Sequence, residues 1–106
     1  MSILTATFFK IDNIGLELDR LKFDRNEKEK LLKMANEVAE YRFIDLILEK
    51  LEEKDKELFL EQLHSGSQAL FIEFLRERIE NLEDILTSHA KILEDEILED
   101  IRQLKQ

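Results

Sequence analysis

The chain has 106 residues, of which 43% are hydrophobic and 39% are charged, and its formal net charge is −9 at pH 7. This length suits one helical domain over residues 1–106 rather than two domains. Cysteine is absent, which excludes disulfides and cysteine-based catalytic or zinc sites and favours the cytoplasm, while the acidic balance disfavours direct nucleic-acid binding.

Residues that favour helix dominate the composition. Proline is absent, glycine occurs only at positions 15 and 66, and Leu, Glu, Lys and Ile are abundant. We therefore predict an all-α protein, a compact bundle of four main helices with a short N-terminal helical segment and a long C-terminal helix. No stretch approaches the roughly 20 apolar residues that span a bilayer, and the N-terminus lacks the features of a signal peptide. We expect neither membrane insertion nor secretion.

Residues 1–23 carry many large apolar side chains without a sustained helical period. We expect a short helix and a turn here, packed on the rest of the domain, with a chain reversal near Gly15. A disordered leader is the alternative, but the number of apolar residues opposes it.

The next segment begins with a helix start signal. Asp24 and Glu27 have the spacing of a capping box, and apolar residues then recur at steps of three and four. A helix is therefore predicted from about Arg25 to Leu51. Its half from Tyr41 onward is apolar nearly all round, so we expect the core to be centred there.

The charged run over residues 52–57 interrupts the apolar pattern and predicts a turn, followed by a helix of about three turns. Gly66 is expected to end that helix, and Ser67 to cap the next one. Beyond Ser67 the apolar spacing allows one long helix or two. Asn81, followed by acidic residues, favours a break near Glu80 and thus two helices.

The last predicted helix runs from Leu82 to about Lys105. At 1.5 Å per residue it would be about 36 Å long. Such a helix either spans the domain or protrudes from it, and a protruding apolar face would need a partner.

Both histidines are candidates for chemistry. Glu61 and His64 have the Glu-x-x-His spacing of helical di-iron sites, but the sequence has no second such pair. We therefore expect His64 to be a polar residue in the last turn of its helix. His89 follows Ser88, and neighbouring helical positions cannot face one another as a nucleophile and a base. We expect His89 to be partly buried on the apolar seam.

Several charged residues are candidates for interaction. Arg42 and Asp45 stand at i, i+3, which fits an ion pair at the edge of the core or a polar handle for a partner. Further carboxylates lie at i, i+4 spacing near the C-terminus, where a regular helix favours a solvated face over calcium binding. These are Asp95, Glu96, Glu99 and Asp100. The cations from Arg20 to Lys33 are expected to pair with acids elsewhere, such as those from Asp95 to Asp100, either within the chain or head to tail between copies.

The chain resembles a family of short, acidic, all-helical proteins of unknown function from ultrasmall bacteria of the candidate phyla radiation. The likeness covers most of the chain and rests on six short segments: Gly15-Leu16 and residues 27–32, 42–51, 55–59, 74–79 and 81–85. Family members tend to carry proline where this chain has Glu80. This difference weakens the prediction of a helix break at that position. The resemblance implies a compact cytoplasmic helical domain, and it transfers no activity and no catalytic residue.

Motifs for enzymatic chemistry do not occur. We find no glycine-rich phosphate loop, nucleophile elbow or His/Cys cluster, so we expect no enzyme and no cofactor. The leading hypothesis is a non-catalytic module that displays a helix face to another protein or to a second copy, as in a homodimer. The alternatives are an acidic inhibitor that mimics nucleic acid and, third, a helical metal-binding protein.

Overall fold

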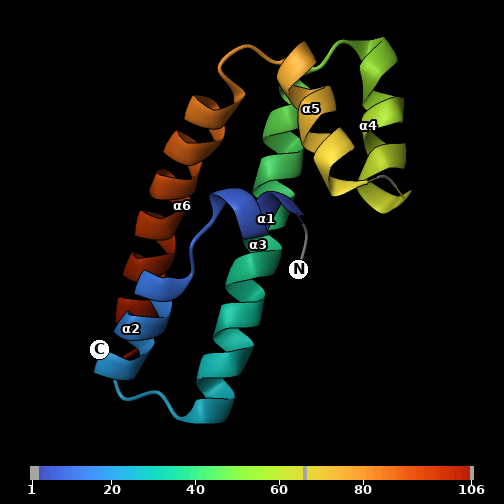
Figure 1. Ribbon diagram of the computed structural model, residues 1–106. Helices are drawn as coiled ribbons and strands as arrows, with labels where there is room; N and C mark the ends of the chain where they lie inside the picture. Colours follow the sequence, from blue (N-terminus) through green and yellow to red (C-terminus); the bar gives the residue numbers. More distant parts are fainter. Residues whose placement is uncertain (1–2, 66, 106) are drawn as a thin grey trace.

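The computed structural model describes residues 3–65 and 67–105, and this part of the chain contains helices and no strand, which confirms the all-α class (Figure 1). The helices are α1 (Ile3–Phe8), α2 (Asp12–Arg20), α3 (Arg25–Lys50), α4 (Glu53–Ser65), α5 (Gln68–Arg78) and α6 (Leu82–Leu104). None of these helices is both long enough and apolar enough to cross a membrane.

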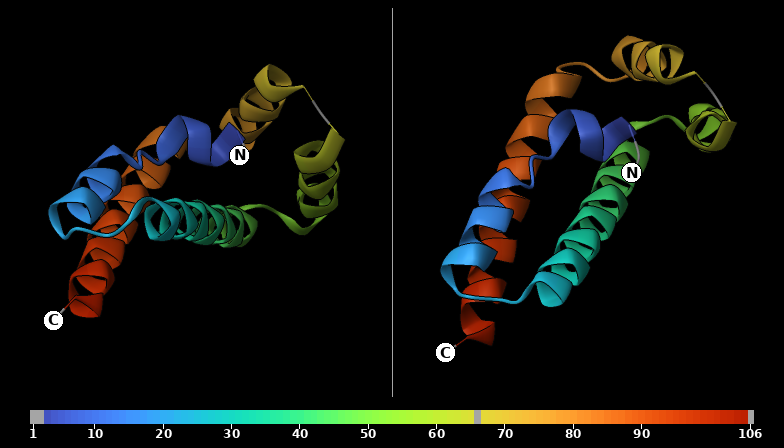
Figure 2. Two further views of the ribbon diagram at one scale, coloured as in Figure 1. Left: turned by 90° about the horizontal axis from the view of Figure 1, so that it is seen from below. Right: turned by 60° about the horizontal axis from the view of Figure 1, so that its bottom comes forward.

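The long helices α3 and α6 run in opposite directions, and α1 and α2 pack against both of them (Figures 1 and 2). Helices α4 and α5 form a hairpin at the end where α3 finishes and α6 begins. The described residues extend over 47 × 23 × 18 Å, with a radius of gyration of 15.4 Å. A compact domain of this length has a radius of about 13 Å. The arrangement is therefore more elongated than a compact four-helix bundle.

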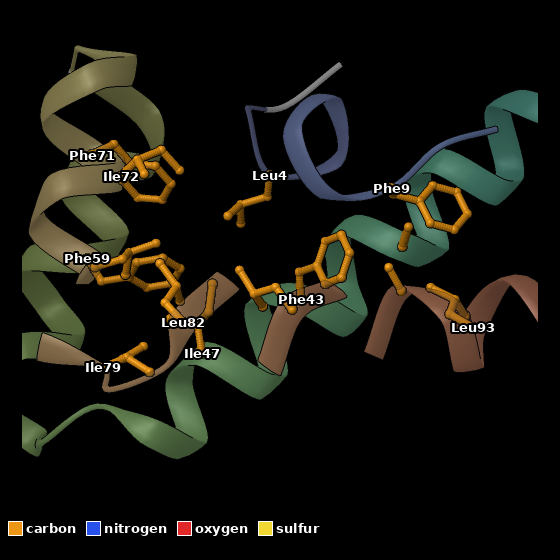
Figure 3. Close-up of a cluster of buried hydrophobic side chains, with 14 of the residues drawn as sticks. Leu4, Phe9, Phe43, Ile47, Phe59, Phe71, Ile72, Ile79, Leu82 and Leu93 are labelled. Carbon is orange, nitrogen blue, oxygen red and sulfur yellow. The ribbon is translucent and has the colours of Figure 1, made fainter. Parts of the chain in front are cut away.

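Apolar side chains from all six helices form one buried cluster. In α3 the buried positions recur every fourth residue, at Ala35, Ala39, Phe43 and Ile47. Figure 3 shows Phe43 and Ile47 in line with the aromatic side chains of the hairpin, where Phe59 of α4 and Phe71 of α5 stack at 5.6 Å between ring centroids. The core thus reaches from α3 into the hairpin.

The predicted start of α3 is confirmed. The backbone N–H of Glu27 donates to the Asp24 carboxylate at 2.8 Å, and the N–H of Asp24 donates to the Glu27 carboxylate at 3.2 Å. This reciprocal capping box satisfies two donors that the first helical turn leaves free. The helix then runs to Lys50, one residue short of the predicted end.

The N-terminal segment differs from the prediction. It forms two helices, and Gly15 lies inside α2 rather than at a chain reversal. The reversal comes at Lys22, whose backbone is left-handed with φ 64°. There the N–H of Phe23 donates to the carbonyl of Leu18 at 3.1 Å, and the N–H of Lys22 donates to that of Asp19 at 3.0 Å. These bonds close the end of α2, a pattern typical of helix C-termini.

The connections on either side of the hairpin differ from the predictions in detail. The charged run over residues 52–57 lies mostly inside α4, because Glu53 and Asp55 are acids that suit the first turn of a helix. The turn is confined to Leu51 and Glu52. The predicted helix end at Gly66 lies outside the described residues, while Ser67 does occupy the N-cap of α5, without a side-chain capping bond.

The predicted break near Glu80 is confirmed, since α5 ends at Arg78 and α6 begins at Leu82. At the break, Asn81 has a left-handed backbone (φ 60°, ψ 35°), and its side chain makes no capping hydrogen bond. An ion pair between Arg76 and Glu83 bridges the junction. Helix α6 then packs against α1, α2 and α3, and it contributes buried side chains as far as Ile101. It therefore spans the domain and does not protrude as a free arm.

Candidate interaction surface

Of the two alternatives for Arg42 and Asp45, the local ion pair does not form. Arg42 of α3 instead reaches across to α6, where its guanidinium donates to the Glu96 carboxylate at 3.3 Å. Both side chains are about half exposed, so this pair contributes little to stability. Asp45 forms no ion pair with any described residue and is exposed. The structure therefore joins Arg42 to Glu96 between α3 and α6, and Asp45 has no ionic partner among the residues it describes.

The four C-terminal carboxylates do not form one common site. Asp95 accepts a hydrogen bond from Lys91 at 3.2 Å, and Asp95 raises the pKa of that lysine, with Glu94 adding to the effect. Glu96 turns toward α3, and Glu99 accepts a bond from Gln103 at 3.4 Å. Asp100 is exposed. Adjacent residues such as Asp95 and Glu96 point about 100° apart on a helix, so these acids divide between different neighbours.

Within the described part of the chain, the cations from Arg20 to Lys33 do not pair with Asp95 to Asp100 as expected. Arg20 pairs with Glu17, and Lys28 pairs with Asp19 at 2.9 Å. The Arg20–Glu17 pair lies within α2, and the Lys28–Asp19 pair joins α3 to α2, which packs against it. Arg25 pairs with Glu29 one turn along its own helix.

Neither histidine belongs to a group of three His, Cys, Asp or Glu side chains that could hold a metal ion within residues 3–65 and 67–105. His64 is exposed at the end of α4. The expectation for His89 is confirmed, since its partly buried ring lies 6.2 Å from the Phe43 ring, centroid to centroid. Its Nε2 atom is buried and has no hydrogen-bond partner among the described residues.

The feature that the sequence did not reveal is an exposed apolar stripe on α3. Met34, Val38 and Tyr41 are 56%, 41% and 70% exposed, and their spacing of four and three places them on one face of the helix. We call these three residues the Tyr41 stripe. Tyr41 was expected in the core, but the buried row of α3 follows Ala39 and Phe43 instead. Apolar residues recur at steps of three and four along α3, but from Tyr41 onward they lie nearly all round the helix, so this pattern does not say which apolar face is buried.

The Tyr41 stripe continues into a groove between the start of α3 and the end of α6. Phe23, Leu31, Met34 and Leu104 give this groove its apolar lining. Its volume is about 370 Å³, and the charged side chains at its rim include Lys30 and Lys105. The Lys105 ammonium lies 4.5 Å from the centre of the Phe23 ring. Apolar surface therefore extends over more than two helical turns of α3.

Ile92 of α6 adds to the same side of the molecule. It is exposed and lies one turn before Glu96, which contacts Arg42. Arg42 in turn lies one turn after Val38. The Tyr41 stripe thus runs beside the line where α3 meets α6. The Arg42–Glu96 ion pair and the exposed Ile92 side chain lie at its border.

No family model, curated protein or solved structure matches this chain. The resemblance to the candidate phyla family stays a prediction.

Proposed function

We propose that the protein is a non-catalytic interaction module that binds another protein chain through the Tyr41 stripe. The observation that carries the proposal is the exposure of Met34, Val38 and Tyr41 together on one face of α3. Isolated exposed apolar residues are ordinary on protein surfaces, but contiguous ones mark binding sites. A cytoplasmic setting suits a module without cysteine.

The chemistry of the stripe supports protein binding in particular. Tyrosine and methionine are enriched at protein interfaces, where an aromatic ring gives a large contact area with little rotamer freedom to lose. The adjoining groove beside Leu31 and Leu104 would accept an apolar side chain from a partner. The mixed charges around the stripe would orient that partner.

The two alternatives have less support. An acidic inhibitor needs aligned, free carboxylates, yet Asp95 and Glu96 already have cationic neighbours on different sides of α6. A metal-binding role rests only on the Glu61 and His64 spacing.

Photo-crosslinking tests the proposal. We would place p-benzoylphenylalanine at position 41 in the source cell, with the same residue at Leu70 as the matched control. Leu70 is 68% exposed on α5, nearly as much as Tyr41, but lies outside the stripe. Specific protein adducts from position 41 and none of them from position 70 are expected. The proposal fails if neither position gives an adduct or if both give the same ones.

A further inference from the structure

The two ends of the Tyr41 stripe carry opposite charges. Lys30 precedes Met34 by one turn and lines the same groove. At the other end, Asp45 follows Tyr41 by one turn, and Glu49 follows Asp45 by another. Residues four apart lie on one helix face, so α3 presents a cation, three apolar side chains and two anions in a row.

These end charges form no ion pair within the described part of the chain, although other cations of α3 do. Lys28 pairs with Asp19 and Arg42 pairs with Glu96, whereas Lys30, Asp45 and Glu49 form no ion pair with any described residue and are exposed. Glu49 also lies in the last turn of α3, where the helix dipole disfavours an acid. A binding partner with the reverse order of charges would compensate both.

A second copy of this chain has that reverse order when its α3 runs antiparallel. We propose that the Tyr41 stripe binds the same stripe of a second copy in a two-fold symmetric dimer, an inference that rests on the proposed function. The midpoint between Lys30 and Glu49 lies between Val38 and Tyr41, so the symmetry axis would pass there. Lys30 of each copy then faces the acidic end of the other.

The geometry of helix packing is compatible with this dimer. Residues at i±4 form ridges, and the ridges of two helices interdigitate in the commonest packing class. A two-fold interface must be self-complementary, and a row with opposite charges at its ends meets this requirement only in the antiparallel direction.

The dimer is expected to be weak and dependent on concentration. From Met34 to Tyr41 the stripe covers only about 10 Å of helix, so the buried area falls at the low end for specific interfaces. The net charge of −9 on each copy also opposes association. Salt at physiological concentration screens that long-range repulsion beyond about 8 Å while close ion pairs persist.

Charge reversal tests both the partner and the direction. Sedimentation velocity from micromolar to millimolar concentration would compare wild type with Lys30→Glu and with the double variant Asp45→Lys/Glu49→Lys. Each variant alone is expected to dimerise about tenfold more weakly, because two symmetric ion pairs become repulsive. An equimolar mixture of the two variants is expected to restore a heterodimer. Dimerisation that both variants retain would overturn the antiparallel direction.

Two further variants separate the apolar contribution from general effects. Tyr41→Ser is expected to abolish the dimer, and Leu70→Ser to leave it intact, since both side chains are similarly exposed. Lys54→Glu on α4 is the matched charge control for Lys30→Glu. Tyr41 is the only tyrosine and tryptophan is absent, so tyrosine fluorescence reports on the stripe alone and should change on dilution. Circular dichroism confirms that each variant is folded.

Failure of this inference is distinguishable from failure of the proposed function. A wild-type chain that stays monomeric to millimolar concentration overturns self-association. In that case, photo-crosslinks from position 41 to a different protein would still support the proposed function, with that protein as the partner. Absence of both the dimer and the crosslinks would reject the inference and the proposed function together.

Discussion

Glu17 of α2 and Arg102 of α6 lie 85 positions apart in the chain and are joined by a hydrogen bond of 2.6 Å between Nε and the carboxylate. Arg20 holds the other carboxylate oxygen of Glu17. The Glu17 side chain is only 8% exposed, and two guanidinium groups contact its carboxylate where α2 meets α6. The hydrogen bond from Arg20, followed by that from Arg102, holds the pKa of Glu17 below its ordinary value of 4.5.

Replacing Glu17 by Gln is expected to lower the melting temperature at pH 7, because two guanidinium groups lose their counter-charge. A folded-state pKa below 4.5 means that the carboxylate stabilises the fold above pH 4.5. This contribution is lost as the pH falls through the folded-state pKa, so the melting curves of wild type and variant should converge in acid. Calorimetry from pH 7 to about pH 3 measures this.

Glu29→Gln is the matched control, since its pair with Arg25 is exposed on one helix. Such surface pairs contribute little, so we expect almost no change at any pH. Equal effects of the two substitutions, or a Glu17→Gln difference that does not depend on pH, would contradict the role given to Glu17.

Phe59 links the hairpin to the core. Its side chain is fully buried and stacks on Phe71. Phe59→Ala is expected to lower the free energy of unfolding by about 3–5 kcal/mol in urea titrations, through lost transfer energy and a cavity. Leu58→Ala, at the preceding, partly exposed position, should cost less than about 1 kcal/mol. Similar costs at both positions would mean that the hairpin is not anchored through Phe59.

Elements with local signals could be predicted from the sequence. The capping box of Asp24 and Glu27 depends on residues three apart, and it placed the start of α3 correctly. The break before α6 likewise follows from Asn81, although through backbone conformation rather than the predicted cap. In both cases the determining contacts lie within a few residues.

Features that depend on distant contacts could not be predicted. Arg42 has an acid within reach on its own helix, Asp45, yet its partner is Glu96, 54 positions away. The exposure of Tyr41 has the same origin. Helices α1, α2 and α6 cover the face of α3 that carries Phe43, and nothing in α3 itself specifies which apolar face they choose. The candidate interaction surface was missed for this reason.

Gly15 occupies a helix interior that does not need glycine. Its backbone is helical, and an added Cβ would meet only the Lys28 side chain, at an ordinary 3.8 Å. Gly15→Ala is therefore expected to raise the free energy of unfolding by about 0.5–1 kcal/mol. Gly15→Val should gain less, because a β-branched side chain is less favourable in helices. A loss of stability with Ala would show that α2 does not tolerate a side chain here.

Lys22 presents the opposite case, a lysine in the left-handed backbone that favours glycine. Lys22→Gly is expected to stabilise the fold by about 0.5–1 kcal/mol, since an L-residue costs about 1 kcal/mol in this conformation. Lys10→Gly removes the same charge where the backbone is not left-handed, and there glycine should destabilise through the entropy of the unfolded chain. Urea unfolding compares the two, and the same sign of change at both positions would contradict this account.

His89 lies against Phe43, and its buried Nε2 has no hydrogen-bond partner among the described residues. A buried polar atom without a partner costs about 1–3 kcal/mol, which an apolar side chain of similar size avoids. His89→Leu is therefore expected to raise the free energy of unfolding by about 1 kcal/mol. His64→Leu is the control, because that histidine is exposed at the end of α4 and should change stability by less than about 0.5 kcal/mol. Destabilisation by His89→Leu would mean that Nε2 makes a polar interaction in solution, so that the α3–α6 seam depends on the histidine rather than tolerating it.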